Sequence, residues 1–240
     1  MKKVVKFGGS SLANAEQFQK VGDIIRSEES RRYVVPSAPG KRFSADTKVT
    51  DLLYACYDKA EAGEDFSDIL TEIKSRFYEI IKGLNLDLSL EEEFRQIEAD
   101  FKAHAGNEYA ASRGEFLNGK VMAAYLGYEF IDSATVIRFD KNGNFDADKT
   151  DKLLTKRLQK CERAVIPGFY GGMEDGTVKT FSRGGSDVTG SIVAIALKAD
   201  MYENWTDVSG FLAADPRIVN NAKPINVITY KELRELSYMG

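Results

Sequence analysis

The residues with the clearest chemical potential lie between Phe181 and Asp187, where the sequence reads FSRGGSD. Two adjacent glycines let the backbone approach a ligand closely, and the apolar run Ile192–Leu197 that follows predicts a helix. The free amides and the dipole at the start of such a helix attract anions. Arg183 adds a planar guanidinium that suits a carboxylate, and Asp187 can hold a cationic side chain or a metal-bound water. The segment therefore predicts an anion site, although a glycine pair before a helix is also ordinary turn chemistry.

A second glycine-rich turn lies near the start of the chain. The β-rich run Val4–Phe7 ends in Gly8–Ser11, and apolar residues then recur at helical spacing over residues 18–25. A strand, a glycine loop and a helix in this order suit phosphate binding, because the loop amides and the helix N-terminus face the ligand. Lys6 can reach over such a ligand, whereas a Walker A sequence places its lysine after the loop. The alternative is that Lys6 is a solvent-exposed lysine at a strand end.

A second strand is followed by a long polar loop that carries two candidate hydroxyl groups. Arg32–Val35 is β-rich, and Pro36–Gly40 begins the loop. Ligands bind at the carboxyl ends of strands in open α/β sheets, so Ser37 and Thr50 are candidates for substrate contact. Thr50 is equally well placed to be only the N-cap of a helix over residues 51–62.

One carboxylate in the middle of the chain is a candidate for binding a cationic group. The stretch Asp65–Ala105 is helical in pattern, shows no chemistry, and predicts an added helical layer or a partner-binding surface. Ser112–Phe116 then opens a helix over residues 116–126, which places Glu115 in the first turn. There Glu115 either complements the helix dipole or receives the ammonium group of a substrate.

The composition is that of an ordinary soluble globular protein. Of 240 residues, 43% are hydrophobic and 29% are charged, which allows a sizeable core. The 33 Lys and Arg against 37 Asp and Glu leave a net charge of -4, which argues against nucleic acid or an anionic membrane as a partner. No apolar run reaches the roughly 20 residues of a membrane span, and Met1–Lys3 leads into a strand rather than a signal peptide. The expected location is therefore cytoplasmic.

The cysteines and the histidine do not form a pattern that would bind a metal. Cys56 and Cys161 lie far apart without metal-ligand spacing, so both are expected to be reduced and partly buried. The single His104 has polar and small neighbours in a predicted helix, and one histidine cannot build a zinc site by itself. His104 is expected at the surface, and no protein metal site is expected.

Strands and helices alternate along the whole chain. Further strands are expected at Tyr128–Ile131, Val136–Phe139 and Arg163–Pro167, and Glu174–Gly176 turns the chain back in a hairpin that delivers the FSRGGSD segment. This alternation predicts a largely parallel sheet covered by helices on both faces. Because no repeat or convincing linker interrupts it, we expect a single catalytic domain over residues 1–240.

Four separated motifs occur in one order: KFGGSS at 6–11, SRGEF at 112–116, FSRGGSD at 181–187, and WTDV with ADPR within 205–217. Together they resemble aspartate kinases, within the amino-acid kinase family, over nearly all of the chain. The resemblance implies a three-layer α/β/α sandwich with a mainly parallel central sheet. It also implies transfer of the γ-phosphate of ATP to the side-chain carboxylate of L-aspartate, which gives 4-phospho-L-aspartate, the entry to lysine, threonine and methionine synthesis. The implied ligands are L-aspartate and Mg²⁺-ATP, and the implied assembly is a homodimer.

The resemblance also implies a role for each residue of the site. Lys6 would contact the transferring phosphoryl group, and Asp187 would orient Lys6. The residues that would cradle phosphate oxygens are Gly8, Gly9 and Ser10. The amino-acid pocket would consist of Ser37, Thr50, Glu115, Phe169, Arg183 and Ser186, with Arg183 on the α-carboxylate and Glu115 on the ammonium. Thr206 and Asp207 would hold the nucleoside, and Arg217 would neutralise phosphates.

The residue types agree with these roles on electrostatic grounds. A substrate carboxylate has an ordinary pKa of about 3.9, so it is ionised near neutral pH and needs no strong base to become a nucleophile. The difficulty is repulsion between this anion and polyanionic ATP. Lys6, amide dipoles and Mg²⁺ are the groups that would offset the repulsion.

The chain departs from the family pattern at two points. Leu212 stands where the family often has a tyrosine near the nucleoside. The family also continues past residue 240 into a lysine-containing segment that completes the ATP site and into paired regulatory ACT domains, so we expect a catalytic fragment without feedback inhibition by lysine or threonine. Two alternatives stay open: another kinase of the family, acting on glutamate, acetylglutamate or uridylate, and a catalytically silent ligand-binding or dimerisation module.

Overall fold

The computed structural model describes residues 1–182, 184–206, 210, 214 and 218–225. The chain divides into two compact units, Met1–Trp205 and Thr206–Gly240. All helices and strands described below belong to the first unit. Among the described residues, no helix is both long enough and apolar enough to cross a bilayer.

A parallel sheet of five strands forms the centre of the first unit. Its strands are β1 (Lys3–Phe7), β2 (Arg31–Pro36), β3 (Glu129–Phe130), β4 (Ala164–Val165) and β7 (Met201–Trp205), in the spatial order β3-β4-β2-β1-β7. Every pairing in this sheet is parallel. A separate antiparallel hairpin joins β5 (Tyr170–Gly172) to β6 (Val178–Thr180). The predicted hairpin is therefore confirmed, and the carboxyl ends of the parallel strands share one edge.

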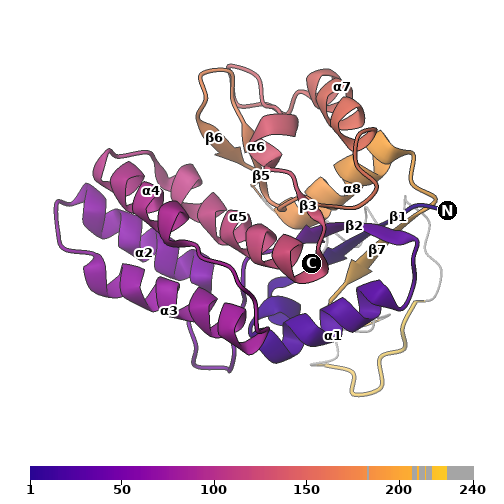
Figure 1. Cartoon of the computed structure of the whole chain (residues 1–240), viewed down its shortest axis with the longest axis horizontal. Helices are drawn as coiled ribbons and strands as arrows, with labels where there is room; N and C mark the ends of the chain where they lie inside the picture. Colours follow the sequence, from indigo (N-terminus) through magenta and orange to yellow (C-terminus); the bar gives the residue numbers. More distant parts are fainter. Residues whose placement is uncertain (183, 207–209, 211–213, 215–217, 226–240) are drawn as a thin grey trace. The chain divides into compact units, whose positions relative to one another are not determined.

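Helices cover both faces of the sheet. One face packs against α1 (Ala15–Arg26) and α5 (Asn107–Leu126), and the other packs against α8 (Gly185–Leu197), which contacts α7 (Ala147–Leu158). Figure 1 shows α7 and α8 on one side of the strands and α1 on the other. The arrangement is the predicted three-layer α/β/α sandwich with a mainly parallel central sheet.

Strand alternation decides which side chains of β1 meet which layer. Val4 belongs to the apolar cluster under α7 and α8, whereas Val5 and Phe7 belong to the cluster under α1 and α5. Because successive side chains of a strand point to opposite faces, Lys6 lies on the same face as Val4, toward α8. The side chain of Lys6 therefore faces the helical layer that carries Asp187.

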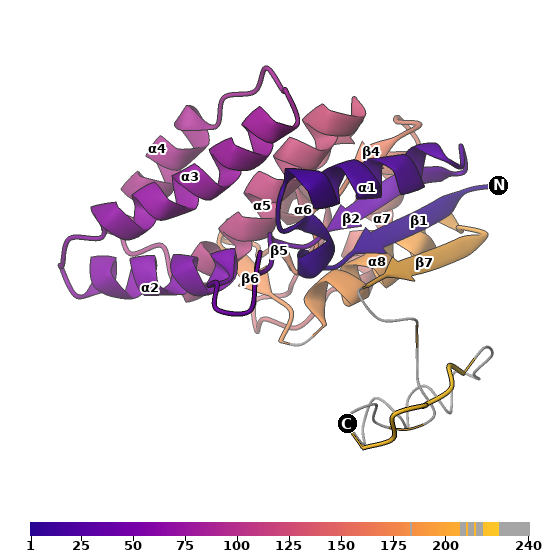
Figure 2. The same cartoon turned by 90° about the horizontal axis from the view of Figure 1, so that it is seen from below.

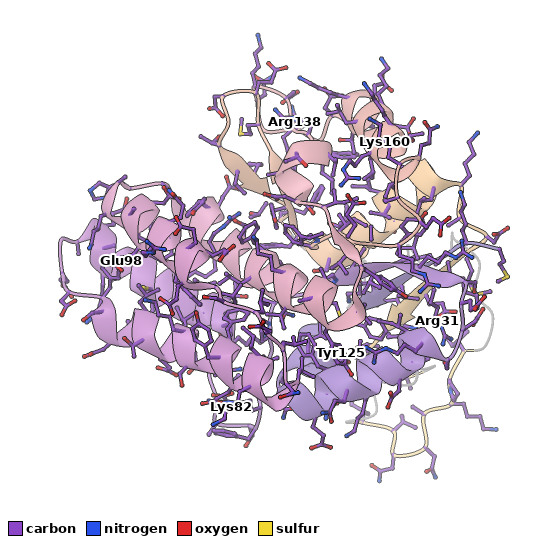
Figure 3. All side chains as sticks on the ribbon, in the orientation of Figure 1. Arg31, Lys82, Glu98, Tyr125, Arg138 and Lys160 are labelled. Atoms are coloured by element: carbon purple, nitrogen blue, oxygen red, sulfur yellow. The ribbon has the colours of Figure 1, made fainter. Side chains whose placement is uncertain are left out.

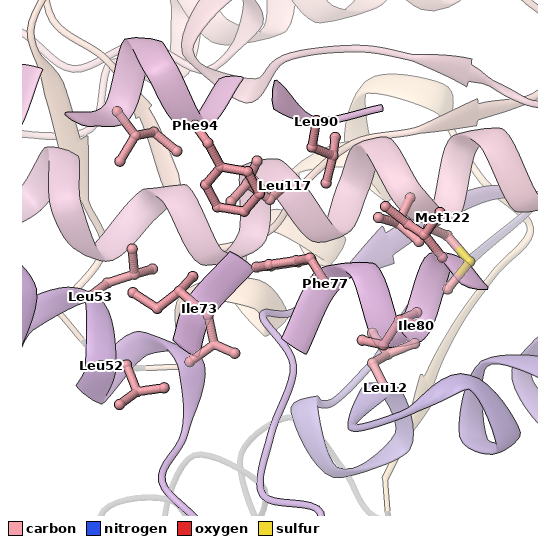
Figure 4. Packing of buried hydrophobic residues seen from close by; sticks show 14 of the residues in the cluster. Leu12, Leu52, Leu53, Ile73, Phe77, Ile80, Leu90, Phe94, Leu117 and Met122 are labelled. Carbon is pink, nitrogen blue, oxygen red and sulfur yellow. The ribbon is translucent and has the colours of Figure 1, made fainter. Parts of the chain in front are cut away.

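The middle of the chain forms a helical group that packs onto α5. It consists of α2 (Val49–Glu61), α3 (Ser67–Gly83) and α4 (Glu91–Lys102), which lie beside one another in Figures 1 and 2. Phe77 of α3 and Phe94 of α4 have ring centroids 6.1 Å apart, and both lie in one buried cluster with Leu117 of α5 (Figure 4). This cluster is continuous with the residues under the sheet, so the group is part of the main core. Charged side chains such as Lys82 and Lys160 point away from the core (Figure 3).

The helical stretch Asp65–Ala105 is confirmed as two helices, α3 and α4, which residues 84–90 separate. One predicted strand was wrong. The predicted strand Val136–Phe139 instead begins in the short helix α6 (Ser133–Val136) and continues only as isolated bridges. The side chain of Asp132 accepts from the Ala134 amide there, and this cap outweighs the β preference of the valine and isoleucine.

His104 also lies outside a helix. Helix α4 ends at Lys102, and His104 follows with a left-handed backbone at φ 57°. Its side chain is exposed, as expected. Cys56 is fully buried and Cys161 is half-buried, and both are free thiols.

Candidate active site

The carboxyl edge of the sheet brings Lys6 and Asp187 together. Lys6 Nζ lies 2.7 Å from Asp187 Oδ1, as an ion pair without hydrogen-bond geometry. The Lys6 side chain is 10% exposed and that of Asp187 is 46% exposed, so the pair faces outward on the carboxylate side. Asp187 sits in the first turn of α8, where Gly184 is the N-cap with φ 55°. The interpretation of Lys6 as a lysine exposed at a strand end is wrong.

The loop after β1 is a short 3₁₀ turn that packs against the loop after β2. The turn covers Gly9–Leu12, and the amide of Gly40 donates to the carbonyl of Gly9 at 2.8 Å. A Cβ at Gly40 would lie 2.6 Å from the carbonyl carbon of Gly9, and one at Gly9 would lie 2.8 Å from Ala38 O. The two loops therefore meet backbone to backbone, which only glycine permits. Around Gly8 a Cβ would meet nothing closer than 3.9 Å, and one of those atoms is Lys6 Nζ.

A buried arginine from the helical group fixes the loop after β2. Arg76 of α3 is 2% exposed and donates to the carbonyl of Gly40 at 2.7 Å and to that of Thr47 at 2.9 Å. Its Nη1 also lies 3.2 Å from Asp46 Oδ2. The guanidinium of Arg42, which bonds both oxygens of Asp46, holds the pKa of that carboxyl well below its usual range. Two carbonyls seven residues apart are thus held by one cation.

The start of α8 is set by the loop after β4. A Cβ at Gly168 would lie 2.4 Å from Ser186 Oγ, and one at Gly185 would lie 2.5 Å from the ring of Phe169. Phe169 has φ 80°, and its amide donates to Thr189 Oγ1 at 3.1 Å. Gly185 is therefore needed for packing against Phe169, in addition to any close approach by a ligand.

A serine pair joins the loops after β2 and before α8. Ser37 Oγ donates to Ser186 Oγ at 2.9 Å, and the Ser37 amide donates to Phe7 O at 3.1 Å. Asn118 of α5 donates from Nδ2 to the carbonyl of Ser37 at 2.6 Å. Asn118 and Thr189 were missed by sequence reasoning. The available signal for Asn118 was its position three residues after Glu115, which is helical spacing.

Glu115 lies in the third turn of α5, because the helix begins at Asn107 and not at residue 116. Its predicted place in a first turn was therefore wrong, and the dipole interpretation is excluded. The predicted start failed because Ser112, Arg113 and Gly114 are buried as well, so this part of α5 has no polar face to mark it. Glu115 is 6% exposed, and burial raises the pKa of its carboxyl to about 8. The Ala38 amide and the Arg113 guanidinium oppose that rise.

Thr50 lies half-buried in the first turn of α2, and the N-cap of that helix is Lys48. The N-cap interpretation of Thr50 is therefore wrong. Arg183, Asp207, Leu212 and Arg217 lie outside the described residues. Thr206 is exposed and is the first residue of the second unit. The structure thus assembles Lys6, Gly8, Gly9, Ser10, Ser37, Glu115, Phe169, Ser186 and Asp187 around one edge of the sheet.

This arrangement can hold anions at the Lys6 end and a cationic group at the Glu115 end. A model of the amino acid kinase family matches residues 1–240. The chain belongs to the amino acid kinase family. Aspartokinase 3 of Bacillus subtilis is 41% identical over 253 residues, which cover 99% of this chain and 56% of the relative.

Solved structures give the same result. The aspartate kinase of Clostridium acetobutylicum has a TM-score of 0.95 at 54% identity, covering 100% of this chain and 56% of that chain. Aspartokinase III of Escherichia coli, in complex with aspartate and ADP, has a TM-score of 0.84 at 29% identity, covering 99% of this chain and 56% of that chain. The resemblance to aspartate kinases is confirmed, and the chain spans just over half the length of these relatives.

Proposed function

We propose that this chain is the catalytic domain of an aspartate kinase, which transfers the γ-phosphate of ATP to the side-chain carboxylate of L-aspartate. The products are 4-phospho-L-aspartate and ADP, at the first step toward lysine, threonine and methionine. The observation that carries the proposal is the ion pair between Lys6 and Asp187, 2.7 Å apart beside the glycine loop of β1. The similarity to aspartate kinases over the whole chain supports it.

The chemistry requires two anions to meet. An oxygen of the substrate carboxylate forms a bond to the γ-phosphorus while the bond from that phosphorus to the β–γ bridging oxygen breaks, and ADP leaves. The nucleophile loses no proton, so no general base is needed. Lys6 supplies positive charge where the phosphoryl oxygens gather, and Asp187 keeps its ammonium group on that side of the sheet. Gly9 and Ser10 offer backbone amides to the phosphates, and Gly8, whose amide donates to the carbonyl of Trp205, leaves space for them beside Lys6.

Mg²⁺ fits this site as an ion that arrives with ATP. Among the described residues, no group of three His, Cys, Asp or Glu side chains is placed to hold a metal by itself. Mg²⁺ in kinases is held largely by phosphates and water with one or two carboxylates, and the half-exposed Asp187 is a suitable carboxylate. When bound, the ion neutralises phosphate charge.

The opposite end of the site recognises a free amino acid. Glu115 receives the substrate ammonium, Arg183 holds the α-carboxylate, and Ser37, Thr50, Phe169 and Ser186 complete the pocket. An acetylated amino acid lacks the ammonium, which argues against acetylglutamate as the acceptor. The proposal further assigns Thr206 and Asp207 to the nucleoside and Arg217 to the phosphates, and it includes a homodimer located in the cytoplasm.

Hydroxamate formation tests the proposal directly. The purified chain is incubated with Mg²⁺-ATP, hydroxylamine and each candidate acceptor: L-aspartate, L-glutamate or N-acetyl-L-glutamate. A separate assay follows ADP release with uridylate. We expect hydroxamate from L-aspartate alone. No product from any acceptor would identify a silent binding module, and product from another acceptor would identify a different kinase of the family.

Lys6→Ala tests the assigned centre. We expect turnover to fall by about 10² to 10³, because a preorganised cation is lost from the transition state. The melting temperature should change little, since Lys6 packs against a partly exposed partner. Lys20→Ala is the matched control, because Lys20 is 57% exposed and pairs with Glu16 on the surface of α1. Equal turnover in Lys6→Ala and Lys20→Ala would remove the proposed role.

A further inference from the structure

Besides Asp187 Oδ1, which forms an ion pair with Lys6, two buried oxygens of the described site have no hydrogen-bond partner. Within the described part of the chain, Glu115 Oε2 and Asn118 Oδ1 are both fully shielded from solvent and unbonded. Glu115 is 6% exposed as a residue and Asn118 is 0% exposed. Buried acceptors without donors are rare and cost free energy, so a pair of them indicates a missing donor.

Both oxygens belong to side chains that hold the same short segment. Glu115 and Asn118 are three residues apart on α5, which places them on one face of the helix. Asn118 Nδ2 donates to the carbonyl of Ser37 at 2.6 Å, and the amide of Ala38 donates to Glu115. Because the carbonyl of Ser37 can only accept, this bond fixes Oδ1 as the free end of the Asn118 amide. The two unbonded oxygens therefore flank the segment 37–38.

The same segment borders the proposed amino-acid pocket. Ser37 Oγ is bonded to Ser186 Oγ in the first turn of α8, the helix that carries Asp187. Ser37 therefore contacts both α8, through Ser186, and α5, through Asn118. Once the carboxyl of Glu115 is ionised, Glu115 Oε2 and Asn118 Oδ1 can only accept hydrogen bonds, so the complementary group is rich in donors.

An alkylammonium has enough donors for both oxygens. It carries three N–H donors in tetrahedral directions and a positive charge that suits a carboxylate partner. A secondary amide, as in an acetylated amino acid, has one N–H and no charge. A hydroxyl also has one donor. Two acceptors one helical turn apart, one charged and one neutral, therefore select a primary ammonium.

We propose that Asn118 Oδ1 is a second acceptor for the ammonium group of the amino-acid substrate, beside Glu115, and determines specificity for a primary amine. The inference rests on the proposed function, since it names how that same site recognises its substrate. In the ligand-free protein the hydrogen bond from Asn118 to the carbonyl of Ser37 fixes the orientation of the side chain, so Oδ1 is positioned before the substrate binds.

The test compares L-aspartate with succinate, which differs from it by the absence of the ammonium group. Isothermal titration calorimetry in the presence of ADP gives the dissociation constant of each ligand for the wild type, Asn118→Leu and Asn118→Ala. Asn118→Leu keeps the side-chain volume. Asn118→Ala provides the same comparison if Asn118→Leu does not fold. Asn142→Ala is the control, because Asn142 lies exposed in the turn after residue 140.

We expect the preference of the wild type for L-aspartate over succinate to fall about tenfold in both Asn118 variants and to be unchanged in Asn142→Ala. Loosening of the Ser37 segment alone would weaken both ligands equally and leave the ratio unchanged, which would overturn the inference. The wild-type protein alone gives a second test. Two acceptors for the ammonium group predict that L-aspartate binds about 100-fold more tightly than succinate, and a preference below tenfold would also overturn the inference. Failure of the wild type to bind L-aspartate at all would instead refute the proposed function.

Discussion

Glu115→Gln is the variant whose effects can be worked out most fully from the structure. Burial raises the pKa of Glu115 from 4.5 to about 8, so in the ligand-free protein this carboxyl carries a proton near neutral pH. The groups that interact with it are Arg113, Tyr170 and Tyr54, and burial holds the pKa of both tyrosines above its usual value. Glutamine copies the size of the protonated acid. The variant thus removes a titration while keeping the shape.

Binding of an ammonium group to Glu115 must expel that proton. With a pKa of about 8, roughly 0.9 of the carboxyl is protonated at pH 7, so about 0.9 proton should leave for each L-aspartate bound. The apparent dissociation constant should fall about 50-fold between pH 6 and pH 8, because the cost of deprotonation shrinks. In Glu115→Gln the affinity should be weaker and nearly independent of pH over this range.

Calorimetric titrations in buffers of different ionisation enthalpy measure the released proton. Glu108→Gln is the control, since Glu108 lies on the same helix but pairs with Lys179 on the surface. Wild-type binding of L-aspartate without proton release, or equal release in Glu115→Gln, would refute the assignment of the ammonium to this carboxylate.

The same pKa predicts a change in stability. An acid whose pKa is raised by folding binds more protons in the native state than in the unfolded state, so its contribution is greatest at low pH and is lost as pH rises toward 8. Between pH 5 and pH 8 the wild type should lose about 3 kcal/mol relative to Glu115→Gln. Urea unfolding at the two pH values measures this, and a constant difference would contradict the raised pKa.

Two further predictions concern the loops that frame the site. Arg76→Met should lower the free energy of unfolding by about 2 to 4 kcal/mol, because two loop carbonyls and Asp46 lose a buried cation, whereas the exposed Arg95→Met should change it by less than about 0.5 kcal/mol. Equal urea midpoints for the two variants would contradict the role of Arg76. Phe169→Gly should be more stable than Phe169→Ala by about 1 kcal/mol, reversing the usual order, because φ is 80° at this position. Thermal unfolding of Phe169→Gly and Phe169→Ala measures this difference, and a more stable alanine variant would show that the backbone at residue 169 relaxes.

Much of the local structure could be read from short-range patterns. The run Val4–Phe7 with its glycines and the following helical spacing predicted a strand, a turn and a helix, and all three are present as β1, η1 and α1. The turn at Glu174–Gly176 predicted the hairpin of β5 and β6. These elements depend on backbone preferences and side-chain periodicity, which neighbouring residues carry.

The start of α5 was the clearest failure. Arg113 and Glu115 are charged, and charged residues normally mark a solvent face or a helix end. Here both are buried in the middle of a 20-residue helix, and Arg113 lies over the ring of Tyr170, 57 positions further along the chain, at 5.5 Å from its centroid. Burial of this kind depends on segments distant in sequence, so no local pattern shows it.

The sequence by itself determined the kinds of chemistry available: a lysine before a glycine loop, an aspartate at a helix start, and alternating strands and helices that make a covered parallel sheet. Only the tertiary structure decided that Gly9 lies against Gly40, that Arg76 holds the loop between them and α2, and that Glu115 and Asn118 present unbonded oxygens at one place. The physical reason is the separation along the chain over which each kind of interaction acts. Backbone preferences act over a few residues, whereas burial, desolvation and close backbone approach depend on contacts between segments far apart in the chain.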